Sequence, residues 1–272
     1  MARDNVAADH PPAELLVRVL GPIEVRSDGA TLHIGGPLEK KLLGALAISA
    51  NHAVSVDALS YALWCDQPPV SRDNTLQTYV SRLRAVLGTS RIRSEDHCYE
   101  LVVGASELDC LVFEALAAEA DSMTSDPNRQ VELCMRALQL WHGRPYGDFA
   151  DVEPFRLEVI RLEELKLAIV ETRIAAEIAL GHEKLVTGSL EALVQEHPFR
   201  EGFWQLLILA LALGGRRVEA LRSCGDLRVV LGELGLEPGP TVQRIEEAIL
   251  ADDRELRSIV GLLGNGDTLA TA

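Results

Sequence analysis

Short runs of β-forming residues come first along the chain. Residues 15–20 are rich in β-formers, Gly21-Pro22 interrupts them, and residues 23–26 alternate between apolar and polar side chains. The segment 27–30 (SDGA) is typical of a hairpin turn, and residues 31–34 supply another strand. The pattern therefore predicts a small antiparallel sheet.

The pattern then changes to a helical period. Pro37 suits the first position of a helix, and leucines recur after it at helical spacing as far as residue 46. Ser55 is a candidate N-cap for a second helix, and Ser71 for a third. The third helix carries an apolar stripe and is expected to stop at Gly88.

A pair of strands around residues 91–93 and 99–103 closes this part of the chain. Strands, three helices and a closing hairpin, in that order, are the elements of a winged helix-turn-helix. The sequence therefore predicts such a domain over residues 14–104, preceded by a disordered N-terminus at 1–13.

From residue 105 onward the pattern is helical almost throughout. Residues 179–193 recur loosely from residue 212, a period of about 33 that suits tetratricopeptide-like helix hairpins. Thr241 is expected to cap a helix ending at Leu250, and residues 256–263 to form a short helix. The helices are predicted at 109–121, 127–141, 153–180, 182–197, 199–213 and 216–234.

The predicted fold class is mainly α. A winged helix-turn-helix with small antiparallel sheets precedes a tetratricopeptide-like repeat domain over residues 105–263, and residues 264–272 form a disordered tail.

The net charge of −15 is unevenly distributed along the chain. Nearly all the excess acid lies beyond residue 104, whereas residues 71–94 hold five arginines against one acid. A basic patch can bind phosphate, and an acidic domain repels it. We therefore expect DNA to meet the first domain and proteins to meet the second.

The third helix carries the predicted base-reading side chains on the face opposite its apolar stripe. Arginine can pair with guanine, asparagine with adenine, and threonine with a thymine methyl group or a phosphate. The hairpin arginines are placed to contact backbone phosphates or a minor groove. The predicted contacts of the helix and hairpin are Arg72, Asn74, Thr75, Thr78, Ser81, Arg82, Arg84, Arg91 and Arg93.

No signature of an enzyme accompanies them. The sequence has no GxxxxGK[ST] phosphate loop, no HExxH pattern among its seven histidines, and no CxxC pair among its five cysteines. The polar start and the absence of a long apolar run favour a cytoplasmic, nucleoid-associated protein. We expect no catalysis, no cofactor, no metal and no membrane contact.

The chain resembles the Streptomyces antibiotic regulatory protein (SARP) family, which joins an OmpR-type winged helix to a bacterial transcriptional activator domain. The motifs are VSVDALSYALWCDQPPVSRDNTLQTYVSRLRAVLG at 54–88, followed by ALQLWHGRPYGDF, RLEELKLAIVETRIAAEIALGHEKLV and LGELGLEPGP. The resemblance covers residues 15 to about 250. It implies a transcriptional activator of a biosynthetic gene cluster that binds promoter repeats, dimerises at least on DNA, and contacts RNA polymerase.

Two departures from the family pattern keep an alternative open. The family's first helix opens with a basic run that contacts phosphates, so Lys40 and Lys41 are also predicted DNA contacts, but here Glu39 precedes them, which weakens this contact. Glu95 and Asp96 replace wing-tip glycines, and both acids would repel phosphate. The alternative is a helical-repeat regulator that binds a protein or a small molecule and has weakened DNA binding.

Overall fold

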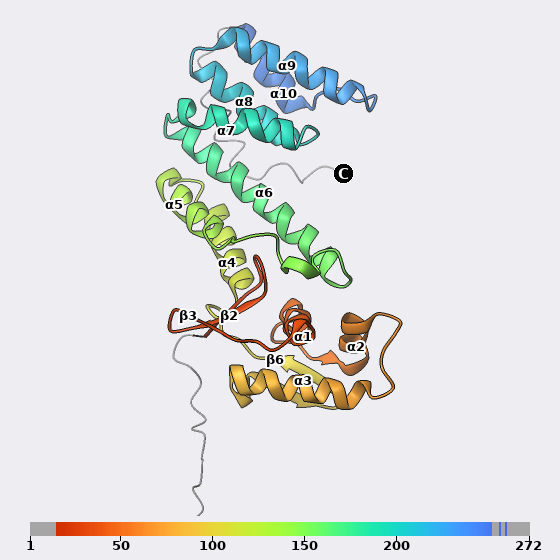
Figure 1. Cartoon of the computed structure of the whole chain (residues 1–272). Helices are drawn as coiled ribbons and strands as arrows, with labels where there is room; N and C mark the ends of the chain where they lie inside the picture. The colour runs from red at the N-terminus through yellow and green to blue at the C-terminus, as the bar shows by residue number, and fades with distance from the viewer. Residues whose placement is uncertain (1–14, 252–255, 257–258, 260–272) are drawn as a thin grey trace, which may run out of the picture. The chain divides into compact units, whose positions relative to one another are not determined.

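The computed structural model describes residues 15–251 together with Leu256 and Ile259 (Figure 1). The prediction of a mainly helical chain with small antiparallel sheets on its N-terminal side is confirmed. The ends predicted as disordered, and most of the short helix predicted at 256–263, lie outside the described residues.

Two compact units make up the chain. The first takes its described residues from Met1–Ala115 and Gln139–Leu165, and the second from Leu116–Leu138 and Lys166–Ala272. A division by contacts does not show which parts fold on their own. The predicted domain boundary after residue 104 therefore stays a prediction.

A three-stranded antiparallel sheet opens the first unit. Its strands are β1 (Leu15–Arg18), β2 (Glu24–Ser27) and β3 (Ala30–Leu32), in the order β1-β2-β3. Asp28 and Gly29 form the β2–β3 turn with φ of 50° and 81°, the left-handed pair that a two-residue hairpin requires. The predicted sheet and turn are confirmed.

Three helices follow: α1 (Pro37–Ile48), α2 (Val56–Trp64) and α3 (Arg72–Leu87). Their apolar stripes meet in one core, in which most of the leucines and valines predicted to face inward are at most 4% exposed. Leu38 and Val56, predicted on the same stripes, are only half-buried. The core side chains include Leu42, Leu46, Leu59, Leu63, Leu76, Val80, Leu83 and Leu87. Burial of these stripes stabilises the helices far more than helix propensity does.

A second sheet packs beside these helices and forms the wing. It has the order β4-β6-β5, with β4 at Val54–Ser55, β5 at Ile92–Glu95 and β6 at Cys98–Leu101. A 3₁₀ turn, η1 (Thr89–Arg91), leads from α3 into β5. The hairpin was predicted, but the two-residue strand β4 was not.

The predicted caps have mixed outcomes. Ser55 accepts a hydrogen bond from the Ala58 N–H at 3.2 Å, as an N-cap should, and Gly88 ends α3 with φ of 102°. Ser71 occupies the N-cap position of α3, but its side chain makes no capping bond. Its hydroxyl lies instead 3.3 Å from that of Thr75, so the expected cap of α3 is corrected.

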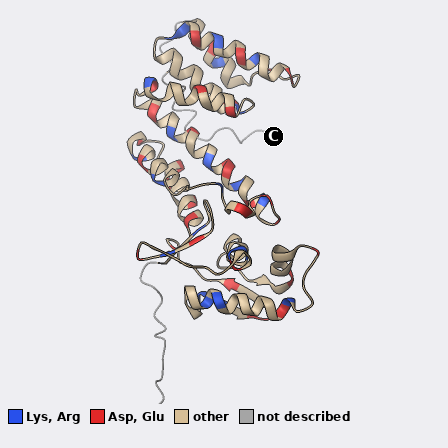
Figure 2. Cartoon of the chain, in the orientation of Figure 1, with Lys and Arg blue, Asp and Glu red and all other residues tan. Residues whose placement is uncertain are grey.

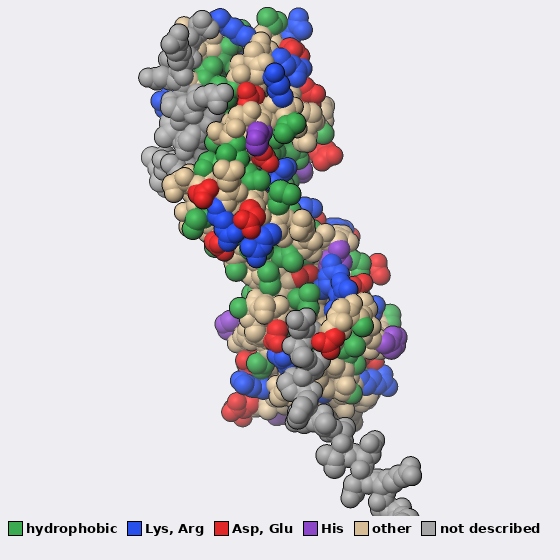
Figure 3. All heavy atoms as spheres, turned by 90° about the vertical axis from the view of Figure 1, so that its left-hand side faces the viewer, with side chains coloured by type: hydrophobic (Ala, Val, Ile, Leu, Met, Phe, Trp, Pro, Cys, Tyr) green, Lys and Arg blue, Asp and Glu red, His purple; other side chains and the backbone are tan. Residues whose placement is uncertain are grey.

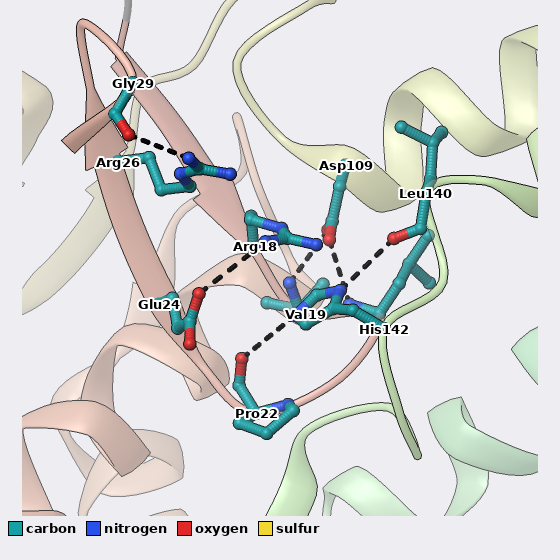
Figure 4. A network of polar contacts seen from close by, with 10 residues as sticks. Arg18, Val19, Pro22, Glu24, Arg26, Gly29, Asp109, Leu140 and His142 are labelled. Carbon is teal, nitrogen blue, oxygen red and sulfur yellow. Dashed lines mark hydrogen bonds and ion pairs between the residues drawn. The ribbon is translucent and has the colours of Figure 1, made fainter. Parts of the chain in front are cut away.

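A buried carboxylate fastens the first sheet to the remainder of the first unit (Figure 4). Asp109 is 1% exposed and accepts hydrogen bonds from the N–H groups of Val19 at 2.8 Å and Leu20 at 3.1 Å. Burial raises the pKa of the Asp109 carboxyl to about 6, although these two hydrogen bonds act to lower it. His142 lies against Gly21 so closely that a Cβ on Gly21 would stand 2.5 Å from the ring.

Further backbone bonds strengthen this attachment. The N–H of His142 donates to Leu20 O, and that of Tyr146 donates to Val19 O. Tyr146 is fully buried and precedes the 3₁₀ turn η2 (Gly147–Phe149). The sheet, α1–α3 and residues 139–165 therefore form one packed body.

The second unit consists of helices packed on their sequence neighbours. Helices α4 (Asp109–Ser122) and α6 (Phe155–Ala179) have residues in both units. Phe203, Trp204 and Leu207 of α8 lie at the centre of its core. The remaining helices are α5 (Pro127–Leu138), α7 (Glu183–Glu196), α8 (Glu201–Leu213), α9 (Arg217–Gly232) and α10 (Pro240–Leu250).

The helix α10 starts two residues earlier than predicted. Gly239 is its N-cap and Pro240 its first residue, so Thr241 lies inside the first turn and is not the cap. Of the helices in the described part of the chain, none is both long and apolar enough to cross a membrane.

Candidate nucleic-acid interface

The outer face of α3 is polar along its whole length. Asn74, Thr78 and Ser81 are exposed, one helical turn apart, while the opposite stripe is buried. Gln77 lies on the same face and was missed by the sequence analysis, although its spacing from Asn74 and Ser81 would have revealed it. This face is the candidate surface for base reading, and Figure 2 shows the basic positions on α3.

The two threonines of α3 make local hydrogen bonds that fix their rotamers. The Thr78 hydroxyl donates to Asn74 O at 2.8 Å, and the half-buried Thr75 hydroxyl donates to Ser71 O at 3.0 Å. With each proton directed inward, the hydroxyl oxygen can still accept a bond and the methyl group can still meet a base.

Arg72, at the start of α3, lies between two acids. Its guanidinium is 2.8 Å from Asp57 and 3.4 Å from Asp73, and its side chain is 41% exposed. Both acids lower the positive potential that Arg72 offers to a phosphate.

Arg82 is the most exposed of the α3 arginines that form ion pairs, and a buried acid holds it. Its Nη1 donates to Glu39 Oε1 at 2.6 Å, and the side chains are 62% and 5% exposed respectively. Burial acts to raise the pKa of Glu39, but bonds from Arg82 and from backbone N–H groups outweigh it and leave that pKa lowered.

The structure corrects the interpretation of Glu39. The sequence analysis treated Glu39 as a departure from the family's basic run that weakens a phosphate contact of α1. Instead, Glu39 Oε2 accepts the N–H of Gly36 at 2.9 Å, which caps α1 from within, and the carboxylate is turned toward Arg82.

Arg84 connects α3 to the wing. Its Nε and Nη2 both donate to Ile92 O, at 2.9 and 2.7 Å. With two donors occupied in a half-buried site, Arg84 stabilises the start of β5 and offers little to DNA.

The two wing arginines differ sharply in their surroundings. Arg91 forms a two-bond ion pair with Glu107, with distances of 2.5 and 2.6 Å, and the side chains are 15% and 22% exposed. The hydrogen bond from Arg91 is the main reason that the pKa of Glu107 is lowered. Arg93 is 66% exposed and stands 4.0 Å from Glu100.

The wing tip is acidic and tightly turned. Asp96 and His97 connect β5 to β6 with φ of 46° and 58°, which is a two-residue turn built without glycine. Glu95 and Asp96 are exposed there. The tip itself is therefore poorly suited to phosphate.

The two lysines of α1 also differ. Lys41 is 8% exposed and donates to Leu63 O at 3.1 Å, and burial lowers the pKa of its amine. It fastens α1 to α2 and is not presented to a ligand. Lys40 is half-buried and lines a pocket with Gly36, Pro37 and Asp148.

The structure thus divides the predicted contact residues into three groups. Lys41, Arg84 and Arg91 are engaged inside the first unit. Lys40 and Thr75 are half-buried. Those presented outward are Arg72, Asn74, Thr78, Ser81, Arg82 and Arg93.

Metal chemistry finds no support in the part of the chain that the structure describes. There, no three His, Cys, Asp or Glu side chains come together as ligands for an ion.

A three-helix core, a wing hairpin and a polar outer helix define the class of this module: a winged helix-turn-helix that binds DNA.

Family models match both parts of the chain. Residues 33–98 match the model described as "Transcriptional regulatory protein, C terminal", and residues 108–250 match "Bacterial transcriptional activator domain". The chain belongs to the SARP family of transcriptional regulators, and it is a DNA-binding regulator rather than an enzyme.

Individual relatives agree with this assignment. The regulatory protein AfsR of Streptomyces griseus is 34% identical over 88% of this chain but only 25% of its own length. The regulatory protein DnrI of Streptomyces peucetius is 32% identical over 87% of this chain and 92% of its own. The chain therefore spans about a quarter of AfsR and nearly all of DnrI.

A solved structure shares the fold. Mycobacterium tuberculosis EmbR, in complex with a low-affinity phosphopeptide, superposes with a TM-score of 0.87 and 28% identity. The match covers 93% of this chain and 69% of that one. The phosphopeptide belongs to EmbR, whose chain extends beyond the matched part.

Proposed function

We propose that this protein activates transcription by placing the outer face of α3 in the major groove of a promoter repeat, with a second protomer beside it, and by contacting RNA polymerase. The observation that carries the proposal is the combination on α3 of a buried apolar stripe and an exposed polar face that ends in Arg82.

The side chains take roles according to their chemistry. Asn74, Thr78 and Ser81 face base edges, since amide and hydroxyl groups can read donor and acceptor patterns there. Arg82 binds a guanine edge or a phosphate, and Arg72 and Arg93 bind phosphates. The half-buried Lys40 is a weaker candidate for a backbone contact.

Two protomers are proposed because one module presents few cations. Three predicted cations of the first unit are engaged inside it, and Arg72 is held between two acids. A single winged helix buries a modest area on DNA, so neighbouring modules raise affinity and specificity together.

A contact with RNA polymerase is favoured by exposed apolar side chains in α2 and in the loop before α3. Val70, in the α2–α3 loop, is fully exposed, and Tyr61 of α2 is 48% exposed. Exposed apolar side chains beside a DNA-reading helix suit a partner bound to the neighbouring promoter DNA. We place this activity at the nucleoid, in the cytoplasm.

The experiment is a titration of the full chain with duplexes from its own gene neighbourhood and with shuffled duplexes of equal length, at low and physiological salt. Arg82→Ala should weaken specific binding by about 1–3 kcal/mol. Arg222→Ala removes the same charge from an exposed position of α9 and is the matched control.

An Arg82→Ala loss without an Arg222→Ala loss, together with increased transcript from the bound promoter in a reconstituted assay, is the expected outcome. No specific shift even at low salt would contradict the proposal, because phosphate contacts are strongest there.

The alternative function, a regulator that binds a protein through its helical repeats, also has an observation behind it. Val218 and Val229 of α9, and Leu234 and Leu236 after it, are all more than half exposed. On the face shown in Figure 3, acidic and basic side chains lie interspersed rather than as one basic surface. The absence of any DNA shift would favour this alternative.

A further inference from the structure

The carboxylate of Glu39 lies behind the recognition helix and points at its most exposed paired arginine. It comes from α1, 43 residues before Arg82 in the sequence, and is 5% exposed. Its two carboxylate oxygens accept hydrogen bonds from the Arg82 guanidinium and from the N–H of Gly36.

The local backbone leaves room for this carboxylate and holds it. The N–H of Gly36 donates to Oε2 at 2.9 Å, while Oε1 receives Arg82 at 2.6 Å. A Cβ at Gly35 would stand 3.0 Å from the carboxyl carbon, and one at Gly36 would stand 3.2 Å from Oε2. The paired glycines thus let the acid lie close against the chain.

We propose that Glu39 is a positioning residue that sets the base discrimination of Arg82. It fixes one guanidinium nitrogen from behind, so that the remaining donors face outward in one orientation. This inference rests on the proposed function and extends it, because it assigns specificity to a side chain that does not touch DNA.

The physical basis is the loss of rotamer freedom. An exposed arginine samples many rotamers and loses that freedom on binding. A charge-assisted bond to a fixed acid removes much of this freedom beforehand, and a planar guanidinium then offers its other donors in a fixed geometry. Bidentate pairing with a base needs such geometry, whereas attraction to a phosphate depends mainly on charge.

Two simpler roles for Glu39 predict different binding. If Glu39 only weakened the charge of Arg82, its removal would tighten binding to every duplex equally. If it only capped α1, its removal would weaken binding to every duplex in step with the loss of folded protein. The positioning role alone changes the ratio between a specific and a shuffled duplex.

The test uses the full chain and a duplex obtained from it by in vitro selection. The discrimination ratio, the Kd for a shuffled duplex divided by that for the selected one, is measured for Glu39→Gln, Glu39→Ala and Arg82→Ala and for the Glu39→Ala/Arg82→Ala double variant. Gly35→Ala places a Cβ 3.0 Å from the Glu39 carboxyl carbon, so it tests the placement of the carboxylate without removing either charge. Circular dichroism melts report the folded fraction of each variant.

We expect Glu39→Ala to lower the discrimination ratio about tenfold, in the range of one lost base contact. Glu39→Gln keeps an acceptor and should fall between it and the natural protein. Binding to the shuffled duplex should be unchanged or tighter in both. In the Arg82→Ala background, Glu39→Ala should change the ratio no further.

A matched control comes from the wing. Glu100→Gln also removes an acid beside an exposed arginine, but at 4.0 Å and without the buried cradle. It should tighten both duplexes alike and leave the ratio unchanged.

An unchanged ratio in folded Glu39→Ala, or an equal fall of the ratio in the Arg82→Ala background, would overturn the inference while leaving the proposed function intact. Failure to enrich any duplex in the selection would instead overturn the proposed function, and the inference with it.

Discussion

Individual arginines of this protein have different tasks despite similar positions in the sequence. Arg91 and Arg93 are two residues apart on the wing, yet Arg91 is 15% exposed in a two-bond ion pair and Arg93 is 66% exposed. We therefore expect a substitution of Arg91 to affect folding and a substitution of Arg93 to affect DNA binding.

Arg91→Ala should destabilise the first unit by about 1–3 kcal/mol, because it leaves the half-buried Glu107 carboxylate without its main donor. Arg93→Ala should leave stability within about 0.5 kcal/mol of the natural protein and lower the salt dependence of DNA binding by about one unit of slope. Urea unfolding and Kd against salt concentration measure the two effects. Equal effects of both substitutions on stability would contradict the assignment.

The wing turn offers a stabilising substitution. His97 has φ of 58°, a left-handed conformation that costs a side chain about 1–2 kcal/mol, more than the roughly 0.5–1 kcal/mol of extra chain entropy that glycine loses. His97→Gly should therefore stabilise the fold by roughly 0.5–1 kcal/mol in thermal unfolding. His97→Ala retains the strained conformation and is the control. A lower melting temperature for His97→Gly would show that the histidine side chain stabilises the turn.

Among the secondary-structure elements, the helices of both parts were predicted from the apolar period, because a helix with one buried face needs apolar residues at helical spacing. The strand β4 escaped prediction since two residues carry no period, and it exists only through its pairing with β6. Ser71 does not cap α3 as predicted, because its hydroxyl hydrogen-bonds with the Thr75 hydroxyl and not with a backbone N–H.

The candidate site was predictable on α3 and less so elsewhere. Exposure of Asn74, Thr78 and Ser81 follows from their angular separation from the buried stripe. The burial of Lys41 and the inward turn of Glu39 depend on packing between helices, which a single sequence does not display. A glycine at the N-cap of α1 also hid the capping role of Glu39, since the usual serine or threonine signal is missing.

The attachment of α4 to the first sheet should depend on pH through Asp109. The pKa of Asp109 in the folded protein, about 6, lies above its ordinary value of 3.8, so the folded state binds more protons between these values. The contribution of Asp109 to the free energy of unfolding is largest below about pH 3.8. It decreases as the pH rises from 3.8 to about 6 and is constant above that.

Asp109→Asn removes the titration, so the difference in unfolding free energy between the natural protein and this variant isolates it. The natural protein should lose about 1.4 kcal/mol relative to the variant between pH 5 and pH 7.5. Urea unfolding of both proteins at the two pH values measures the change. A constant difference would contradict a pKa of about 6 for Asp109 in the folded protein.

For the whole molecule, the first unit joins the winged helix to residues 139–165, so its integrity depends on chain far from α3 in the sequence. A fragment of residues 1–104 lacks both Asp109 and Tyr146, which bond to Val19 and Leu20 in the full chain. Exposed apolar side chains of the first sheet would then destabilise the fragment.

The fragment should consequently bind a selected duplex more weakly than the full chain, both because it is less stable and because a single module buries little area on DNA. Its melting temperature separates the two causes, and binding is compared at a temperature where the fragment is folded. Equal affinity of folded fragment and full chain would contradict binding as a pair.

Base reading by the outer face of α3 can be tested by comparing the duplexes that the natural full chain and its Asn74→Ala variant enrich from a random pool. We expect the variant to enrich the same sequence with a relaxed preference at one or two adjacent positions, with adenine the base most affected. Identical base preferences in both pools, at equal folded fractions, would contradict it.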